Sequence, residues 1–275
     1  MMRSLLLLSE PVWHRGITMA DTKNRAFELD FLRGIAIVMM MFMHFSYDIR
    51  YEFGVNTFSY LRSAWFWTFV HPIIIVLFVG LSGICCTFSK NNFKRGGKLL
   101  GVALLFTIVT GFVTYKMGIY CLILFNVLHM LSISTLVYAL IFWIERKTGA
   151  DPKKVSFIML LVGTWITMTN NNLYMYDWAS SNMLLYPLGI QVEGAPEVAD
   201  FMPLIPWMGV FLICAAAGRI LYKEKKSLFP NAGKTVRAIT RPLEFLGRHS
   251  LIIYLVHQPV IYGVLYLIFK ISGRV

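Results

Sequence analysis

The chain has 275 residues, a formal net charge of +12 and only 15% charged residues, whereas soluble domains carry about 25%. Its mean hydropathy is +0.63. These values exclude an ordinary soluble globular domain and predict an all-α, polytopic transmembrane helical bundle. The basic residues fall in short loops between apolar runs, so they indicate membrane orientation and exclude a nucleic-acid-binding protein.

The domain organisation predicted from these runs is simple. Residues 25–270 form a single transmembrane domain, preceded by an N-terminal tail over residues 1–24. The LLLL run in this tail is too short to cross a bilayer. Translation from Met19 rather than Met1 is therefore an open alternative.

Apolar runs predict seven membrane spans, at residues 29–47, 64–88, 99–115, 119–144, 155–169, 204–221 and 250–269. Of the 26 basic residues, 21 lie in the N-terminal segment or in the loops after the second, fourth and sixth spans. Because Lys and Arg concentrate on the cytoplasmic side, we expect the N-terminus inside and the C-terminus outside. The expected location is the cell membrane, as a multi-pass protein of the inner membrane.

The first span carries ionisable residues on one face. At about 100° per residue, Asp30, Arg33, His44 and Asp48 of ELDFLRGIAIVMMMFMHFSYDIR form a single stripe. Ionisable groups inside a membrane are costly and face a bundle interior or a wet cavity. The stripe therefore predicts a polar cavity, with about 21 Å of helix between Asp30 and His44.

The predicted topology distributes the other polar residues between two ends of this cavity. We expect an outer cluster that opens outward and a basic mouth that opens inward, with His129 near mid-depth. A buried histidine is also commonly a structural hydrogen-bonding residue, which is the favoured interpretation for His129 and His71. The outer cluster comprises His44, Asp48, His71, Trp207 and His257, and the inner end comprises Asp30, Arg33, Arg95, Arg248 and His249.

The four cysteines show no CxxC spacing, so neither a zinc ribbon nor a disulfide framework is indicated.

The segment over residues 170–203 is long for a connection, and such segments are often lids or binding elements. The sequence is compatible with two interpretations of this segment, a lid and a plain external loop.

The motifs LDFLRGIAIVMMMFMHFSYD, FVGLSGICCTFS, NVLHMLSIS, DFMPLIPWMGVF and GRHSLIIYLVHQP resemble bacterial relatives of the heparan-alpha-glucosaminide N-acetyltransferase catalytic-domain family. This family belongs to a wider group of membrane acyltransferases. The resemblance extends over roughly residues 25 to 265. Its first motif is the most specific, and the family's motif residues fall here on Asp30, Arg33, Gly34 and His44.

The resemblance implies a donor, acetyl-coenzyme A or another acyl-coenzyme A, at the cytoplasmic side. The acyl group passes to a hydroxyl or amine of a polar acceptor, such as a glycan, at the outer side. The animal enzyme has more spans, and its active-site histidine follows its first span. In this chain the next histidine after the first span is His71.

Acyl transfer from a thioester needs a base or a histidine nucleophile, and cationic groups for the coenzyme phosphates. His44 is the expected base or acyl carrier, oriented by Asp48, with His257 as a further catalytic residue. We expect Arg33, Arg95 and Arg248 to bind the coenzyme. The expected substrate-binding residues are Asp30, Arg33, His71, His129, Asp200 and Trp207.

The same residues leave other functions open. A transporter or export factor would use the stripe to pass a polar solute or protons. A haem or metal protein ranks last, because no helix shows a paired-histidine spacing, and no metal is expected. The expected partners are the lipid bilayer, the acyl donor and the acceptor, with a homodimer left open.

Overall fold

In this computed structural model, the described residues are 26–175 and 179–273, with the backbone alone for residues 171–175. The predicted tail over residues 1–24 and the alternative start at Met19 lie outside them. The long helices are α2 (Phe27–Tyr47), α3 (His71–Ile84), α4 (Asn92–Met117), α5 (Val127–Thr148), α6 (Pro152–Met175), α7 (Leu204–Leu221), α8 (Lys234–Arg248) and α9 (Ser250–Ile271).

Short elements join the long helices. They are the π-helical turns η2 (Asp48–Glu52) and η4 (Phe66–Val70), the 3-10 helices η3 (Ser59–Arg62) and η5 (Met183–Leu188), and the strands β1 (Ala179–Ser180) and β2 (Gln191–Val192). The two strands pair in parallel. The NMLLYPLGI part of the 170–203 segment forms η5 between them.

Among the described residues, six helical stretches are long and apolar enough to cross a membrane. They contain α2, α3, α4, α5, α7 and α9, which confirms an all-α polytopic bundle. The predicted span at 155–169 lies in α6, which is not among the six because Lys153 and Lys154 begin it and Asn170 to Asn172 follow the apolar run. Seven spans and a cytoplasmic N-terminus remain predictions. We call the end of the bundle where α2 begins the inner end.

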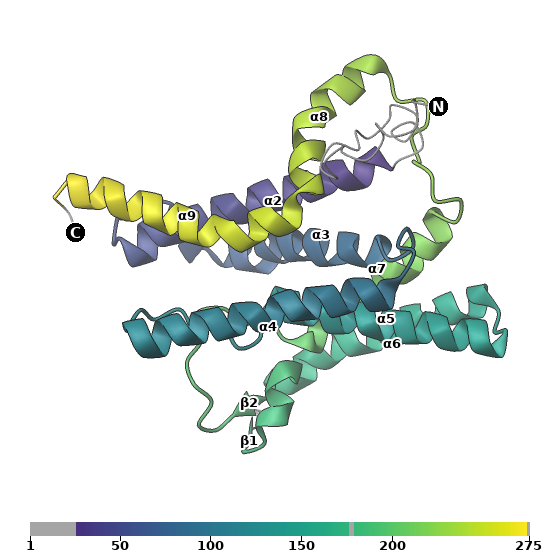
Figure 1. The fold of residues 1–275 in the computed structure, drawn as a ribbon, viewed down its shortest axis with the longest axis horizontal. Coiled ribbons are helices and arrows are strands. Elements are labelled where there is room, and N and C mark those ends of the chain that lie inside the picture. The colour runs from purple at the N-terminus through teal and green to yellow at the C-terminus, as the bar shows by residue number, and fades with distance from the viewer. Residues whose placement is uncertain (1–25, 176–178, 274–275) are drawn as a thin grey trace, which may run out of the picture.

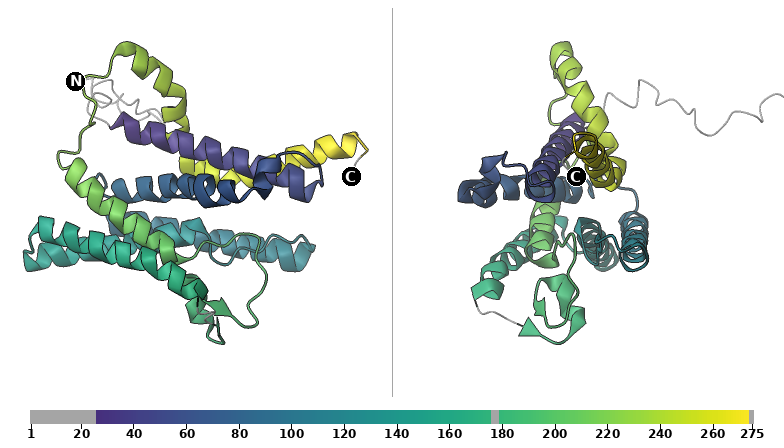
Figure 2. Two further views of the ribbon diagram at one scale, coloured as in Figure 1. Left: turned by 180° about the vertical axis from the view of Figure 1, so that it is seen from behind. Right: turned by 90° about the vertical axis from the view of Figure 1, so that its left-hand side faces the viewer.

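The long helices pack in two layers (Figure 1). Helices α9, α2 and α3 form one layer, and α4, α5 and α6 form the other. Helix α7 joins the layers because it packs against α3 on one side and against α5 and α6 on the other. The end view in Figure 2 separates the same two groups.

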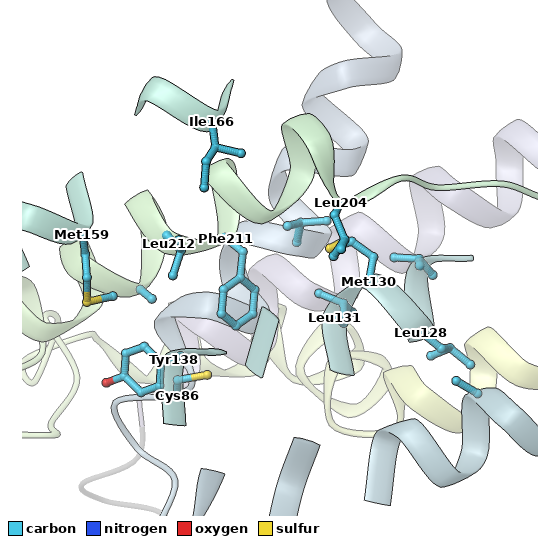
Figure 3. Packing of buried hydrophobic residues seen from close by; sticks show 14 of the residues in the cluster. Cys86, Leu128, Met130, Leu131, Tyr138, Met159, Ile166, Leu204, Phe211 and Leu212 are labelled. Atoms are coloured by element: carbon cyan, nitrogen blue, oxygen red, sulfur yellow. The ribbon is translucent and has the colours of Figure 1, made fainter. Parts of the chain in front are cut away.

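The largest apolar core lies around α7. Phe211 is fully buried there, and Figure 3 shows its ring between Leu131, Leu212 and Tyr138. Helices inside a bilayer gain no hydrophobic driving force from contact with each other, so close van der Waals packing holds them together. The tight core around Phe211 is therefore what fixes α3, α5 and α6 on α7.

Helix α8 packs very closely against α2. A Cβ atom on Gly34 would overlap the backbone of Leu243, and a Cβ atom on Gly247 would overlap the carbonyl oxygen of Asp30. Only glycine allows two helix backbones to come this near. The pair therefore fixes the position of α8, and of the start of α9 that follows it.

Two helices differ most from the sequence prediction, one in where it begins and the other in being a helix at all. The fourth span was expected to begin at residue 119, but α5 begins at Val127, after Asn126 accepts a hydrogen bond from the backbone N–H of Leu128. Helix α8 was taken as part of a loop. Its alternating basic and apolar residues do not form an apolar run, so a search for spans passes over it.

We expect Gly247→Ala to lower the free energy of unfolding by about 1–3 kcal/mol, the usual range for overpacking. The added methyl group would have to push α8 away from the α2 backbone. Thermal unfolding of the purified protein in detergent measures the change. Gly263→Ala in α9 is the matched control, since a Cβ there meets nothing within 4 Å. Equal stability of the two variants would contradict the close approach.

Candidate active site at the outer end of the bundle

The ionisable face of α2 is turned into the protein, as the sequence predicted. Asp30 is 4% exposed and Asp48 is 2% exposed, while Arg33 and His44 are half-buried. Phe42, on another side of the same helix, is 54% exposed. The polar residues of α2 therefore meet other helices, and its apolar residues are left to contact lipid.

A pair of histidines forms at the outer end of this face. The rings of His44 on α2 and His257 on α9 have centroids 5.0 Å apart. His257 lies in the first half of α9, yet its ring stands beside that of His44 at the outer end, the side on which the sequence placed it. The rings meet because α9 starts beside α2, below α8, rather than at the inner end of the bundle (Figure 1).

The hydrogen bonds of His257 define its tautomer. Its Nδ1 atom lies 2.6 Å from the carbonyl oxygen of Tyr254, and a carbonyl can only accept, so Nδ1 carries the proton. Its Nε2 atom is buried and has no hydrogen-bond partner among the described residues. His257 therefore presents a free lone pair in a buried site beside a second imidazole.

Asp48 does not orient His44, in contrast to the sequence prediction. Both carboxylate oxygens of Asp48 accept hydrogen bonds from Nε2 of Gln258, at 3.0 and 3.1 Å. No hydrogen bond joins Asp48 to His44 in the described part of the chain. Asp48 instead ties the end of α2 to α9, one residue beyond His257. It holds the two helices that carry the histidines.

His71 and Trp207 take different places. His71 begins α3, with its ring 4.8 Å from that of Trp67, and it is near enough to interact electrostatically with His44. Trp207, in the first turns of α7, packs against the apolar core. The structure therefore brings His71 toward the histidine pair and assigns Trp207 to packing.

His129 is a structural residue rather than a substrate ligand. Its Nδ1 atom accepts a hydrogen bond from the backbone N–H of Asn126 at 3.3 Å, and its Nε2 atom lies 3.2 Å from the Thr107 hydroxyl. Both ring nitrogens are thus engaged, which caps α5 and joins it to α4. No nitrogen is left for a substrate.

Asp200 belongs to the segment that crosses the outer end before α7. Its carboxyl group interacts with the Asn126 side chain, the Tyr254 hydroxyl and the Phe201 backbone. Burial raises the pKa of this carboxyl from 3.8 to about 6, although these three hydrogen bonds lower it. The backbone N–H of Met202 also donates to the carbonyl oxygen of Phe125 at 3.0 Å. These contacts hold the segment down on α5 and α9.

The inner end carries two converging guanidinium groups. Arg33 donates to the Asp30 carboxylate at 3.0 Å and contacts the Cys85 sulfur. Arg95 on α4 lies 3.6 Å from the Cys86 sulfur and donates to the Ser82 backbone and side chain. Arg33 and Arg95 therefore approach the inner end of α3 from α2 and α4.

Arg248 does not join them. It is exposed, and its Nε atom donates to the Glu244 carbonyl of its own helix at 3.2 Å. Asp30 is buried and paired with Arg33, so it serves as the counter-ion of that residue. The predicted basic mouth thus reduces to Arg33 and Arg95.

Three of the four helix histidines lie near one another and the fourth does not. His44 and His257 pair and His71 is within electrostatic range of His44, while His129 is held by Asn126 and Thr107. Within the described ranges, no set of three or more His, Cys, Asp or Glu side chains is placed to hold a metal ion.

Sequence reasoning missed three residues of the outer site. Gln258 holds Asp48, Tyr254 fixes the tautomer of His257, and Asn126 links Tyr254 to His129. The available signal was weak. Gln258 adjoins His257 in the HQP motif, and a polar amide in an apolar run needs a partner.

Residues 25–259 match a family model described as "Heparan-alpha-glucosaminide N-acetyltransferase, catalytic". The match covers most of the chain and all of the residues of the histidine pair and the inner arginines. No curated protein and no solved structure matches the chain.

The raised pKa of Asp200 predicts a pH dependence for the segment it holds. Between about pH 4 and 6 the Asp200 carboxyl is protonated while the segment is attached to α5 and α9, and ionised when the segment is detached. The attachment of the segment therefore weakens as the pH rises through this window. Hydrogen exchange of residues 179–203, corrected for intrinsic rates, should show less protection at about pH 7 than at about pH 5.

Asp200→Asn should remove this pH dependence, because the amide cannot ionise. Asp151→Asn is the matched control, since Asp151 is an exposed carboxylate that caps the start of α6. A pH dependence that survives in Asp200→Asn would show that another group is responsible.

Proposed function

The chain belongs to the heparan-alpha-glucosaminide N-acetyltransferase catalytic family, and from this premise we propose that it moves an acyl group from cytoplasmic acyl-coenzyme A to a polar acceptor on the outer side. The acceptor supplies a hydroxyl or amine, as in a glycan. The observation that carries the proposal is the histidine pair. The buried, unpartnered Nε2 of His257 lies on a ring 5.0 Å from that of His44.

A buried imidazole with a free lone pair suits proton abstraction. A general base has to be in the neutral form and near the hydroxyl or amine that it deprotonates. The hydrogen bond to the Tyr254 carbonyl keeps the proton of His257 on Nδ1, so Nε2 remains able to accept one. Asp48 and Gln258 hold the two helices in register, which keeps both rings at the same place.

In the proposed reaction, Nε2 of His257 takes the proton of the acceptor group as that group attacks the thioester carbonyl. The new C–O or C–N bond forms and the C–S bond breaks. The proton on His257 then passes to the departing thiolate by way of His44, which accepts it at one ring nitrogen and gives up a proton from the other. Both imidazoles end neutral, and the products are the acylated acceptor and free coenzyme A, so atoms and charges balance.

The donor is expected to enter at the inner end. Arg33 and Arg95 offer two cationic groups near the end of α3 for its phosphates, and guanidinium groups suit phosphate recognition. About 21 Å of α2 separates Asp30 from His44. The thioester must therefore reach the histidine pair along the polar face of α2.

Transport of a polar solute is the second candidate. The ionisable residues of α2 stand at both ends of the helix, Asp30 and Arg33 at one and His44 and Asp48 at the other, whereas a catalytic pair needs only one end. A transporter would pass substrate across liposomes without coenzyme A and would form no acylated product. Flux assays and transfer assays on one preparation separate the two functions.

We expect His257→Ala and His44→Ala each to lower labelled acetyl transfer from acetyl-coenzyme A by about 10²- to 10⁴-fold, the usual share of general acid–base catalysis. The loss should fall on kcat, because the acceptor and donor sites remain. Purified protein in vesicles is assayed with a panel of amino- and hydroxyl-bearing sugars as acceptors.

His249→Ala is the control for these variants. His249, expected at the inner end, is exposed just before α9, and its ring lies 4.4 Å from that of Phe245 rather than beside either histidine of the pair. A stable acetyl group on His44, found by mass spectrometry in His257→Ala, would make His44 an acyl carrier instead. Full activity in His44→Ala would remove it from the mechanism.

Arg95→Gln should raise KM for acetyl-coenzyme A by about tenfold with a smaller change in kcat, because a charge-assisted contact to phosphate contributes about 1.5–3 kcal/mol. Initial rates at varied donor concentration measure this. Lys147→Gln removes an exposed charge at the end of α5 and should leave KM unchanged. Equal KM values for the two variants would exclude Arg95 from the donor site.

A further inference from the structure

Helix α8 has two chemically different sides. At about 100° per residue, Val236, Ile239, Leu243 and Leu246 fall within one arc of roughly 80°. The opposite arc is mostly basic. Its members are Lys234, Arg237, Arg241, Glu244 and Arg248.

A third strip between these sides is what packs against the protein. Thr240, Glu244 and Gly247 are buried against α2. Glu244 accepts a hydrogen bond from Thr240 at 2.7 Å and lies 3.7 Å from Arg237, so its charge is compensated within the helix. The strip leaves most of the apolar and basic sides uncovered.

The apolar side is open in the described part of the chain. Ile239 is 71% exposed and Val236 is 49% exposed, and the preceding segment adds Phe229, which is 59% exposed. On the basic side, Lys234 and Arg241 are exposed. Large exposed apolar side chains on one side of a helix, with exposed cations on the other, are typical of helices that lie in a membrane interface.

The position of α8 in the fold agrees with this. It follows the inner end of α7 and leads directly into α9, and both are apolar enough to cross a membrane. Figure 1 shows α8 turned across the direction that the long helices share. This orientation, across the direction of the spans, is the one expected of a helix that lies along a membrane surface.

A cavity adjoins the apolar side. It has a volume of about 610 Å³ and lies between the start of α2, the segment before α8 and α8 itself. Phe27, Phe31, Leu228, Phe229 and Val236 are among its lining residues. Since Val236 belongs to both, the cavity and the exposed stripe form one apolar surface.

We infer that α8 is an in-plane membrane helix that binds anionic lipid. The stripe of Val236 and Ile239, with the adjoining cavity, takes the acyl chains. Lys234 and Arg241 bind the negatively charged headgroups. The ligand class is an anionic phospholipid of the leaflet at the inner end, and the inference does not depend on the acyltransferase proposal.

The test uses the full chain in vesicles of phosphatidylcholine, alone or with a minority of phosphatidylglycerol. The photo-crosslinker p-benzoylphenylalanine replaces Ile239 in one variant and Ala238 in another. Ala238 is exposed but lies outside the apolar stripe. Mass spectrometry identifies each adduct.

We expect lipid adducts at position 239 to exceed those at 238, with phosphatidylglycerol over-represented relative to its share of the bilayer. The double change Lys234→Gln and Arg241→Gln should lower that enrichment by up to about tenfold. Arg146→Gln with Lys147→Gln, at the end of α5, should leave it unchanged.

Adducts between position 239 and protein would overturn the inference and indicate a second copy or another subunit on this face. Equal yields at 238 and 239 would also overturn it. Lipid adducts without any preference for phosphatidylglycerol would overturn the assignment of Lys234 and Arg241.

Discussion

A charged or polar side chain inside a bilayer has to find its partner within the protein, and this requirement governs how α2 packs. An unpaired polar group in an apolar environment costs several kcal/mol. Arg33 meets Asp30 and the inner end of α3, and Asp48 meets Gln258 on α9. Asp30 lies on α2 itself, but the end of α3 and Gln258 belong to other helices, so satisfying these contacts places α3 and α9 beside α2. The same rule joins α5 to α7 in the second layer, through the buried pair of Glu145 and Arg219 at 2.6 Å.

Glycine at the points of closest approach makes these pairings possible. Gly34 and Gly247 let α8 lie against the α2 backbone, and α9 then begins beside α2 instead of at the inner end. That offset brings His257, early in α9, level with His44, late in α2. Gly163 and Gly209 play the corresponding part between α6 and α7. At both contacts the missing side chain lets the helix backbones approach, and the polar pairs then hold the helices in register.

Sequence reasoning predicted the class of fold, the direction of the α2 stripe and the bounds of α7, because long apolar runs and helical phase determine them. It did not find α8, whose apolar residues are spaced along one side of a basic helix. It misassigned Asp48 and did not identify the residues that hold His129, since phase on one helix identifies a face but not the partner on another. Gln258, Asn126 and Thr107 are those partners. Arg33 and Arg95 approach each other because α2 and α4 both contact the end of α3. The pattern within one segment does not predict such a contact between helices.

Tyr254 connects the two parts of the outer site. Its carbonyl oxygen accepts the hydrogen bond that keeps the proton of His257 on Nδ1, and its hydroxyl contacts Asn126 and Asp200. Asp200 belongs to the segment that covers the outer end before α7. The hydroxyl of Tyr254 thus joins α9 to the start of α5 and to the segment before α7, while its backbone carbonyl orients the ring of His257. One residue therefore ties the position of the histidine pair to the packing of three elements, because the turn of α9 that carries Tyr254 also carries His257.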